Sequence, residues 1–174
     1  MNKNLIIIAA VSMNGVIGVD GKIPWHISED LIHFRLSTID NVVIVGYNTY
    51  ISLPPKALEG RIYLVLNAGN YFENKCENVY QFSRLDVLLS FIDYHPEIFL
   101  DKKIFVAGGA MVYDGLIDYC NEAIITWINI ECPDGNKFFP MEKFDESFNQ
   151  IDVDWYWNTS VSGIEYCVKH YIRL

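Results

Sequence analysis

Residues 18–34 read GVDGKIPWHISEDLIHF, and the rest of the chain is organised around this stretch. It starts as a loop with glycines at two points, passes through a Pro-Trp pair and continues as a helix. Ser28 is placed to cap that helix, so Glu29 and Asp30 fall in the first turn, where exposed N–H groups and the helix dipole favour carboxylates. Acidic residues at such positions are usually exposed, so position alone assigns no function to either one.

Helical geometry separates the two acids. At about 100° per residue, Asp30, Leu31 and Phe34 fall within one third of the helix circumference, and Glu29 lies at the edge of that face. A carboxylate on an apolar face is costly to bury unless something binds it, and desolvation raises its pKa. These properties suit a group that binds a cationic or amidine-like ligand and assists proton transfer. We therefore expect Asp30 to be an active-site acid.

Short apolar runs lie on both sides of this stretch and alternate with helical segments. We expect buried strands at residues 5–11, 42–45, 62–66, 79–82 and 104–107. Further helices are expected at 85–94, where Ser83 and Asp86 predict a capping box, and at 110–119. Strands that alternate with helices predict a mainly parallel sheet with helices on both faces.

The last third of the chain has a different pattern. Long strands are expected at residues 122–131, 148–157 and 164–173, with polar turns such as 158–160 between them, which predicts antiparallel pairing. We therefore expect an α/β fold in a single domain over residues 1–174. Its central sheet would have about eight strands, mainly parallel, with an antiparallel C-terminal edge.

Composition and charge limit the possible functions. The chain has 174 residues, of which 51% are hydrophobic and 14% aromatic, as expected of a globular domain with a large core. Its formal net charge of -9 disfavours a general nucleic-acid or anionic membrane surface. An anionic ligand would need local groups to attract it.

Cysteine and histidine usage argues against a metal centre. The four cysteines form no Cys-x-x-Cys motif and the four histidines form no ligand-spaced set with them, so we expect no metal and no redox dithiol. The apolar run at 5–11 is too short for a membrane span, and no signal-peptide cleavage site follows it. We expect a cytoplasmic protein with reduced thiols.

Several short motifs occur in one order along the chain. They are Ala9-Ala10, Gly15-Val16-Ile17-Gly18, Pro24-Trp25, Asp30-Leu31, Phe34, Gly46 with Thr49, Gly60-Arg61, Gly108-Gly109 with Tyr113, and Thr126. Each motif is weak by itself, but the ordered set resembles the dihydrofolate reductase family from Leu5 to the end. The resemblance implies a dihydrofolate reductase-like fold, dihydrofolate as small-molecule substrate and NADPH as cofactor. Hydride would pass from the nicotinamide C4 to the pterin C6, and a proton would reach N5.

The resemblance also implies roles in the pterin pocket. Asp30 would be its only ionisable group, bonding the 2-amino group and N3 and promoting protonation at N5. Thr126 would support the same amino group directly or through water, and Trp25 would wall the pocket and hold an ordered water. Without the resemblance, a tryptophan near a helix is usually core, and a threonine in a strand is usually a β-branched filler.

The rest of the substrate would contact a second group of residues. By resemblance, Leu31, Phe34 and Leu53 would flank its aromatic parts. Arg61 would pair with the α-carboxylate of the glutamate tail, because a guanidinium fork fits a carboxylate with two hydrogen bonds. A lone arginine after a glycine is otherwise usually a solvated turn residue.

The implied cofactor site consists largely of backbone groups. Ala10 and Ile17 would hold the nicotinamide carboxamide, and Gly108-Gly109 would let the backbone approach the dinucleotide. The other residues expected at this site are Gly18, Gly46, Asn48, Thr49, Tyr113 and Arg84.

This chain departs from the family mostly in the cofactor site. Tyr47-Asn48 stands where the family usually has a basic pair, and Asn67, Ala68 and Met111 stand where polar or basic residues are frequent. We therefore predict NADPH with a smaller preference over NADH than is usual, partly compensated by Arg84.

Two loop positions also differ from the family. Ile23 lies in a mobile-loop position where larger flexible residues are often seen, and Asn136 lies where an aspartate is common. Loop closure can limit turnover, so these differences bear on the rate.

The expected activity is therefore that of an NADPH-dependent dihydrofolate reductase, and the expected state is a monomer. Two alternatives stay open at this point. One is another pteridine or pyrimidine reductase of the same fold, such as the pyrimidine reductase of riboflavin synthesis. The other is a catalytically weak folate-binding or structural protein.

Overall fold

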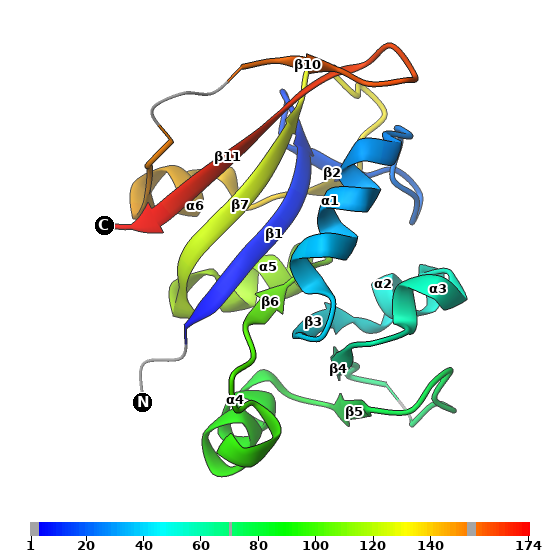
Figure 1. The fold of residues 1–174 in the computed structure, drawn as a ribbon, viewed down its shortest axis with the longest axis vertical. Coiled ribbons are helices and arrows are strands. Elements are labelled where there is room, and N and C mark those ends of the chain that lie inside the picture. Colours follow the sequence, from blue (N-terminus) through cyan, green and yellow to red (C-terminus); the bar gives the residue numbers. More distant parts are fainter. Residues whose placement is uncertain (1–3, 70, 153–155) are drawn as a thin grey trace.

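The computed structural model describes residues 4–69, 71–152 and 156–174. Its main sheet contains, among the described residues, nine strands (Figure 1). They are β1 Leu5–Ser12, β3 Val42–Gly46, β4 Ile62–Leu66, β5 Val79–Phe82, β6 Ile104–Val106, β7 Cys120–Ile128, β9 Phe148–Gln150, β10 Asn158–Thr159 and β11 Glu165–Arg173. Eight of them follow the order β10-β11-β7-β1-β6-β3-β4-β5, and β9 pairs with β11 beside this path.

Strand directions agree with the expectation. The pairs β7-β1, β1-β6, β6-β3, β3-β4 and β4-β5 are parallel. The pairs of β11 with β7, β9 and β10 are antiparallel. The prediction of a mainly parallel sheet with an antiparallel C-terminal edge is confirmed.

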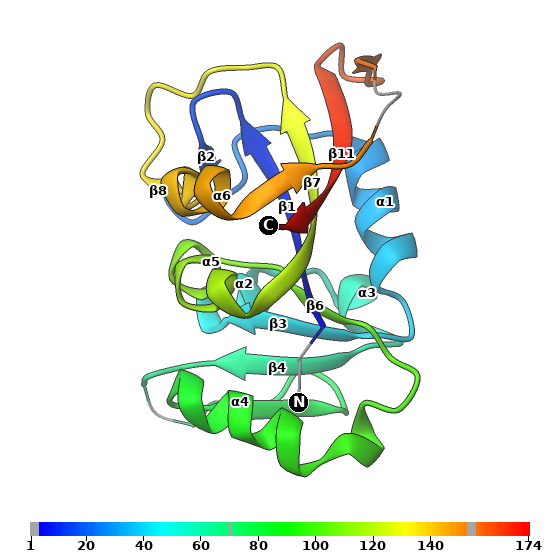
Figure 2. The same cartoon turned by 90° about the vertical axis from the view of Figure 1, so that its left-hand side faces the viewer.

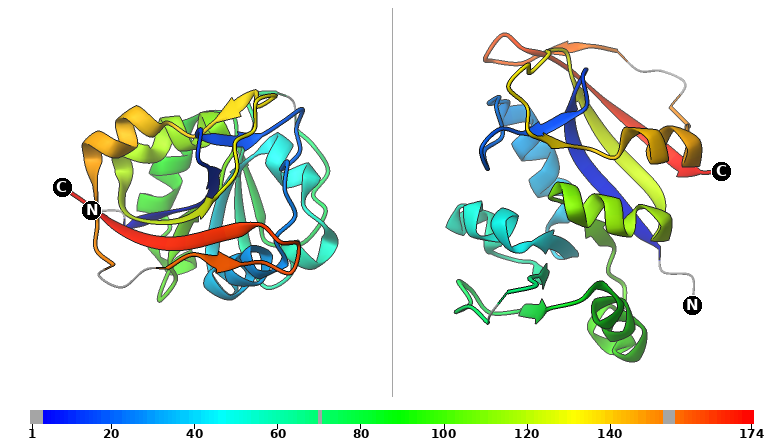
Figure 3. Two further views of the ribbon diagram at one scale, coloured as in Figure 1. Left: turned by 90° about the horizontal axis from the view of Figure 1, so that it is seen from above. Right: turned by 180° about the vertical axis from the view of Figure 1, so that it is seen from behind.

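Helices cover both faces of this sheet. The α-helices are α1 Ser28–Thr38, α2 Tyr47–Ser52, α3 Pro55–Leu58, α4 Leu85–Tyr94, α5 Ala110–Leu116 and α6 Met141–Ser147, with 3-10 turns η1 Pro96–Ile98 and η2 Ile117–Tyr119. In Figure 2, α1 lies on one side of the long strands β1, β7 and β11, and α5 and α6 lie on the other. Residues of α4 pack in the same buried cluster as residues of α5. Figure 3 shows the same separation of α1 from α6 from above.

The first strand explains why the sheet must be covered twice. Leu5 and Ile7 belong to the cluster under α4 and α5, whereas Ile6 and Ile8 pack with Phe34 of α1 on the other face. A strand with apolar side chains on both faces is stable only where both faces are buried. Each fully buried isoleucine contributes roughly 1.5–3 kcal/mol, so β1 anchors both layers.

The expected helix caps are wrong. Ser28 is the first residue of α1, whose N-cap is Ile27 without a side-chain cap bond; the Ser28 hydroxyl lies 3.4 Å from His26 Nε2 instead. The N-cap of α4 is Arg84, also without a side-chain cap bond. Its guanidinium forms an ion pair with Asp86, so that carboxylate takes no part in a capping box.

The C-terminal strands also differ in length from the prediction. β9 ends at Gln150, where a strand to residue 157 was expected, and residues 153–155 of that expectation lie outside the described residues. Asn158 and Thr159, expected in a turn, form the short strand β10. α5 ends at Leu116 and continues as the 3-10 turn η2.

A small second sheet was not predicted. β2 Val16–Gly18 pairs with β8 Lys137–Phe138 and thereby connects the loop before α1 to a loop near the C-terminal edge. Within the described ranges, no helix combines the length and apolarity that a membrane crossing requires.

Candidate active site

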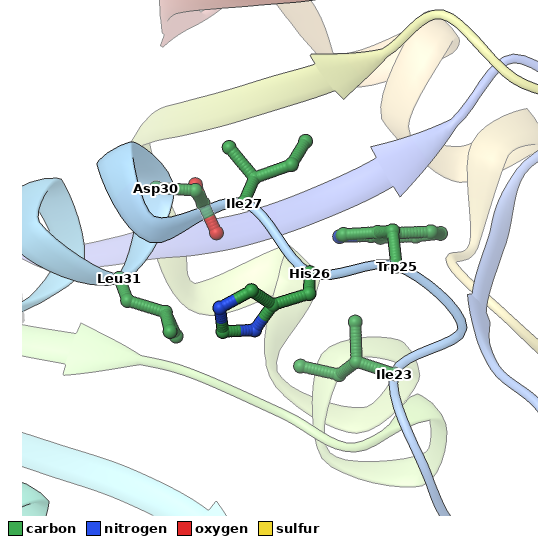
Figure 4. Close-up of a pocket in the computed structure, with 6 residues that line it drawn as sticks. All are labelled: Ile23, Trp25, His26, Ile27, Asp30 and Leu31. Carbon is green, nitrogen blue, oxygen red and sulfur yellow. The ribbon is translucent and has the colours of Figure 1, made fainter. Parts of the chain in front are cut away.

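A cavity of about 170 Å³ opens between the loop after β2 and the first turn of α1. It is lined by Ile23, Trp25, His26, Ile27, Asp30 and Leu31. The close-up in Figure 4 shows the His26 ring between the side chains of Leu31 and Ile23, with the Asp30 carboxylate beside them. Most of this lining is apolar, so a carboxylate here is poorly solvated.

Asp30 has the electrostatic environment that its helical position predicted. Burial raises the pKa of its carboxyl above the ordinary range, while a hydrogen bond from the Thr126 hydroxyl and the nearby His33 lower it. The net effect is a raised pKa, so the protonated carboxyl persists to higher pH than in an ordinary aspartate.

Thr126 reaches Asp30 because of the sheet order. It lies in β7 directly opposite Ala10 of β1 and is only 3% exposed. Its hydroxyl donates a hydrogen bond to the Asp30 carboxylate on α1, so this threonine does more than fill a strand position.

The aromatic and aliphatic residues divide between the cavity wall and the core. Trp25 is buried and packs with Ile27 and Ile128, next to Ala10. Leu31 is 52% exposed at the cavity, whereas Phe34 is half-buried and shares an apolar cluster with Leu53. The three positions Asp30, Leu31 and Phe34 therefore lie along one side of α1, as the spacing predicted.

Arg61 is not a solvated turn residue. Its side chain is buried, and Nε donates to Thr38 Oγ1 at 2.9 Å. The Nη1 group donates to the carbonyls of Ala57 and Glu59 at 2.9 and 2.8 Å, and Nη2 donates to the Arg35 carbonyl at 3.3 Å.

These bonds fix the guanidinium without neutralising it. A guanidinium has five N–H donors, so one N–H on Nη2 is left over after these four bonds. Its carbon lies 5.9 Å from the centre of the Phe34 ring, and no carboxylate in the described part of the chain forms an ion pair with it. Arg61 is thus a rigid, buried positive group beside Phe34.

Glycines line a second region, at the carboxyl ends of β3 and β6. The Gly46 N–H donates to the Gly108 carbonyl at 2.7 Å. A Cβ on Gly109 would lie 3.4 Å from Thr49 Oγ1, and one on Gly108, whose φ is +111°, would lie 3.1 Å from the Tyr113 ring. Glycine therefore suits position 108, where a side chain would crowd the Tyr113 ring and strain the backbone.

Tyr113 connects the two regions. Its hydroxyl donates to the Ile8 carbonyl of β1 at 2.8 Å, and its ring lies against Gly108. Burial raises the pKa of this phenol, and the nearby Asp30 charge adds to the effect. The glycine region and the acid therefore share one wall.

A second hollow of about 210 Å³ lies where β4 and β5 end. It is lined by Asn67, Gly69, Tyr71, Gln81, Phe82 and Ser83. Sequence reasoning missed Tyr71 and Gln81; the available signal was that ligands bind at the carboxyl ends of parallel strands. Asn48 is exposed at the start of α2, and Arg84 is exposed and paired with Asp86, so neither is built into this hollow.

The loop before α1 is tied down by Asn136. Its Oδ1 accepts the Asp20 N–H at 3.1 Å, and its Nδ2 donates to Asp20 Oδ1 at 2.7 Å. The Asn136 N–H also donates to the carbonyl of Gly18 at 3.2 Å, next to the β2-β8 pair that contains Ile17. Ile23, farther along this loop, is 58% exposed at the cavity mouth.

Sequence reasoning also missed two histidines. His26 lines the cavity, and its carbonyl accepts the Ser162 hydroxyl at 2.7 Å. His33 lies one helical turn after Asp30 and affects its charge. The helical spacing of His33 was the only signal available for it.

Ligand sites at the carboxyl ends of parallel strands, such as the glycine region and the second hollow, are typical of α/β proteins that bind nucleotides. The particular family follows from comparison with known proteins: a family model described as dihydrofolate reductase matches residues 4–173. The chain belongs to the dihydrofolate reductase family.

Individual relatives agree with this assignment. Dihydrofolate reductase of Mycoplasma pneumoniae is 34% identical over 156 residues, which cover 84% of this chain and 93% of that protein. The enzyme of Neisseria gonorrhoeae is 30% identical and covers 97% of both chains. The solved structure of dihydrofolate reductase from Enterococcus faecalis, complexed with NADP(H) and RAB-propyl, matches with a TM-score of 0.78 at 25% identity, covering 99% of this chain and 98% of that one.

Proposed function

We propose that this chain reduces 7,8-dihydrofolate to 5,6,7,8-tetrahydrofolate with NADPH, and that Asp30 assists protonation at N5. Membership of the dihydrofolate reductase family supports the reaction, and the Enterococcus faecalis relative complexed with NADP(H) supports the cofactor. The observation that carries the assignment of Asp30 is a carboxyl of raised pKa in an apolar cavity, bonded to Thr126. When bound, the cofactor supplies the hydride.

Asp30 and Thr126 would hold the pterin edge in one orientation. A carboxylate can accept hydrogen bonds from an amino group and a ring N–H side by side, while Thr126 holds it from behind. Orientation of the reacting carbon toward the hydride donor then lowers the barrier, because the encounter becomes intramolecular. The raised pKa of Asp30 allows this carboxyl to favour a proton at N5.

Apolar residues would exclude water, and Arg61 would hold the substrate tail. Trp25, Leu31, Phe34 and Leu53 supply the apolar wall. Arg61 has its charge and one N–H available, and its guanidinium is fixed in place by four bonds. A pre-oriented guanidinium binds a carboxylate with a smaller loss of side-chain entropy.

The cofactor would lie along the glycine region. The residues proposed to contact it are Ala10, Ile17, Gly18, Gly46, Asn48, Thr49, Gly108, Gly109, Tyr113 and Arg84. The exposed residues Asn48, Ala68 and Met111 bring no positive charge, and Arg84 already neutralises Asp86. We therefore keep the proposal of NADPH with a reduced preference over NADH.

We further propose a cytoplasmic monomer whose 174 residues form one domain. One sheet that passes through all parts of the described chain supports the single domain. The net charge of -9 supports the proposal that neither nucleic acid nor an anionic membrane is a partner.

The variant Asp30→Asn tests the proposed role of Asp30 in protonation at N5. The amide keeps the shape but cannot act as a carboxylate, so we expect kcat at pH 7 to fall by about 100-fold or more, and by less at low pH where the substrate is already protonated. Steady-state consumption of NADPH with dihydrofolate measures this. Glu29→Gln is the matched control, since the amide oxygen can still accept the Val161 N–H, and it should keep most of the turnover. Full activity of Asp30→Asn at every pH would contradict the role.

One assay separates the proposed reaction from its alternatives. Loss of NADPH absorbance on addition of dihydrofolate, blocked by a diaminopyrimidine antifolate, is expected of the proposed enzyme. A folate-binding protein would bind dihydrofolate without consuming NADPH. A pyrimidine reductase would consume NADPH with its own substrate only.

A further inference from the structure

We propose that His33 is a positioning residue for Asp30: it lies one turn farther along α1, partly buried like the acid, where an imidazolium stabilises the Asp30 carboxylate. The consequence for catalysis rests on the proposed function of Asp30. The electrostatic coupling itself does not, because it is a property of the free protein.

The first observation is the placement of the two residues on α1. Asp30 and His33 are three positions apart in this helix, and side chains at that spacing are neighbours with Cβ atoms about 5–6 Å apart. Both are partly buried, so solvent screens their interaction less than it would on an open surface. A charge on His33 therefore acts on Asp30 at short range.

The second observation is a further histidine on the sheet beneath. In the β7-β11 ladder, Ile124 is opposite His170 and Thr126 is opposite Val168. Residues two apart in a strand point to the same face, and Ile124 packs against the same buried cluster as Phe34 of α1. His170 thus lies on the α1 side of β11, the same side as the hydroxyl of Thr126.

The electrostatics of this cluster agree with its geometry. Burial lowers the pKa of His33, Asp30 raises it, and His170 lowers it. His33 in turn lowers the pKa that burial raises in Asp30.

Other titratable groups face Asp30 from the neighbouring elements. These are Glu29 on α1, Tyr113 on α5 and Tyr166 on β11, and burial raises the pKa of both phenols. The tyrosines therefore stay neutral at neutral and acid pH. Among the described residues that act on Asp30, His33 is then the one that can carry a positive charge.

The charge of His33 determines the direction in which the titration of Asp30 shifts. Above its pKa, His33 is neutral and acts weakly on Asp30. As the pH falls, an imidazolium forms on His33 and opposes the addition of a proton to Asp30. Asp30 should then lose its charge at lower pH than it would beside a neutral residue.

A carboxyl titration in the free protein tests this coupling. The Asp30 side-chain carbon is followed by 13C NMR, assigned by its absence from Asp30→Asn. In His33→Gln we expect the apparent pKa of Asp30 to rise by roughly half a pH unit to one unit, because the positive neighbour is gone. The acid-side pH profile of kcat/KM for dihydrofolate should move in the same direction. His33→Phe removes the same charge with a different shape and should give the same shift.

His170→Gln is the control of opposite sign. It removes the imidazole that opposes protonation of His33, so His33 charges more easily and the Asp30 titration should move to lower pH. A purely structural role for His33 would lower stability or kcat without this pair of opposite shifts. An Asp30 titration that is the same in wild type and His33→Gln would overturn the proposal. Failure of the proposed catalytic role would instead appear as full turnover of Asp30→Asn with the NMR shifts intact.

Discussion

Arg61 shows at the scale of one residue how the fold prepares a charged group. A buried guanidinium without a carboxylate partner in the described residues is costly, and here its cost is reduced by three backbone carbonyls and the Thr38 hydroxyl. These bonds come from α1 and from the segment around α3. The chain therefore holds a rigid, buried positive group between α1 and α3.

Arg61→Lys is predicted to damage both stability and substrate binding. Lysine has no planar fork, so several of the four bonds are lost and buried carbonyls stay unpaired, which should lower the free energy of unfolding by about 2–4 kcal/mol. Urea unfolding measures this loss. KM for dihydrofolate should rise at least about tenfold, whereas KM for dihydropteroate, which lacks the glutamate, should change little. Equal rises in both KM values would contradict contact with the tail.

Asp30 was predictable at this scale, and His33 was not. A carboxylate at helical spacing from Leu31 and Phe34 is visible in the sequence. The meaning of His33 depends on how deeply its ring is buried and on a histidine from β11, which only tertiary contacts supply. Sequence reasoning therefore singled out Asp30 as a candidate acid and missed the neighbouring His33.

At the scale of elements, a loop contact replaces a charge that the family often has. Asn136 next to β8 and Asp20 after β2 form a reciprocal pair in which each side chain meets a complementary group. Asn136 Nδ2 donates to the Asp20 carboxylate at 2.7 Å. An aspartate at position 136 would place a second carboxylate against that of Asp20. In this chain the asparagine is thus the fitting partner.

Asn136→Asp is predicted to weaken the β2-β8 connection. It replaces a hydrogen bond by repulsion between two carboxylates, and a loop that opens more often should lower kcat by a few-fold to about tenfold. Steady-state kinetics of the wild type, Asn136→Asp, Asp20→Asn and the double variant complete a double-mutant cycle that measures this contact.

The double variant is the informative member of that cycle. It restores a donor opposite a carboxylate, so it should recover most of kcat, with a coupling free energy of about 1–2 kcal/mol. Additive losses in the double variant would show that the two side chains do not act together.

Element ends were less predictable than element types. The apolar runs at 62–66 and 79–82 became β4 and β5 with the expected bounds. The caps at Ser28 and Ser83 did not form, because nearby side chains offered other partners: His26 lies close to the Ser28 hydroxyl, and Arg84 pairs with Asp86. Local propensity favours the start of a helix in each region. Which residue becomes the N-cap, and whether its side chain forms a cap bond, depends on the competing contacts.

At the scale of the whole molecule, charge opposes the binding of a phosphorylated dinucleotide. The chain carries a formal net charge of -9, and the exposed residues around α2 that should face the extra phosphate include Asn48 rather than a cation. A charged hydrogen bond contributes about 1.5–3 kcal/mol, so each missing cation reduces the discrimination for NADPH by roughly 10- to 100-fold.

Asn48→Arg is predicted to restore part of that discrimination. In this variant, kcat/KM with NADPH divided by kcat/KM with NADH should be about tenfold or more higher than in the wild type. Asn149→Arg adds the same charge on β9, which lies with β11 at the sheet edge remote from β5, and should leave the ratio nearly unchanged. A very large NADPH preference in the wild type would contradict the prediction.

The sequence by itself determined the layered architecture and singled out Asp30 as the candidate acid. Continuous apolar strands require cover on both faces, and the ordered motifs predicted the family that the comparisons confirmed. Both signals are local, since periodicity and motif order are read along the chain.

Only the tertiary structure decided which distant groups meet. Thr126 reaches Asp30 because β7 pairs with β1, and Asn136 reaches Asp20 because β8 pairs with β2. Burial of Arg61 and the nearness of His33 to His170 likewise depend on how α1 packs on the sheet. Hydrogen bonding and desolvation act over a few ångströms in space, so the charges of this site are set by packing that residue order alone does not reveal.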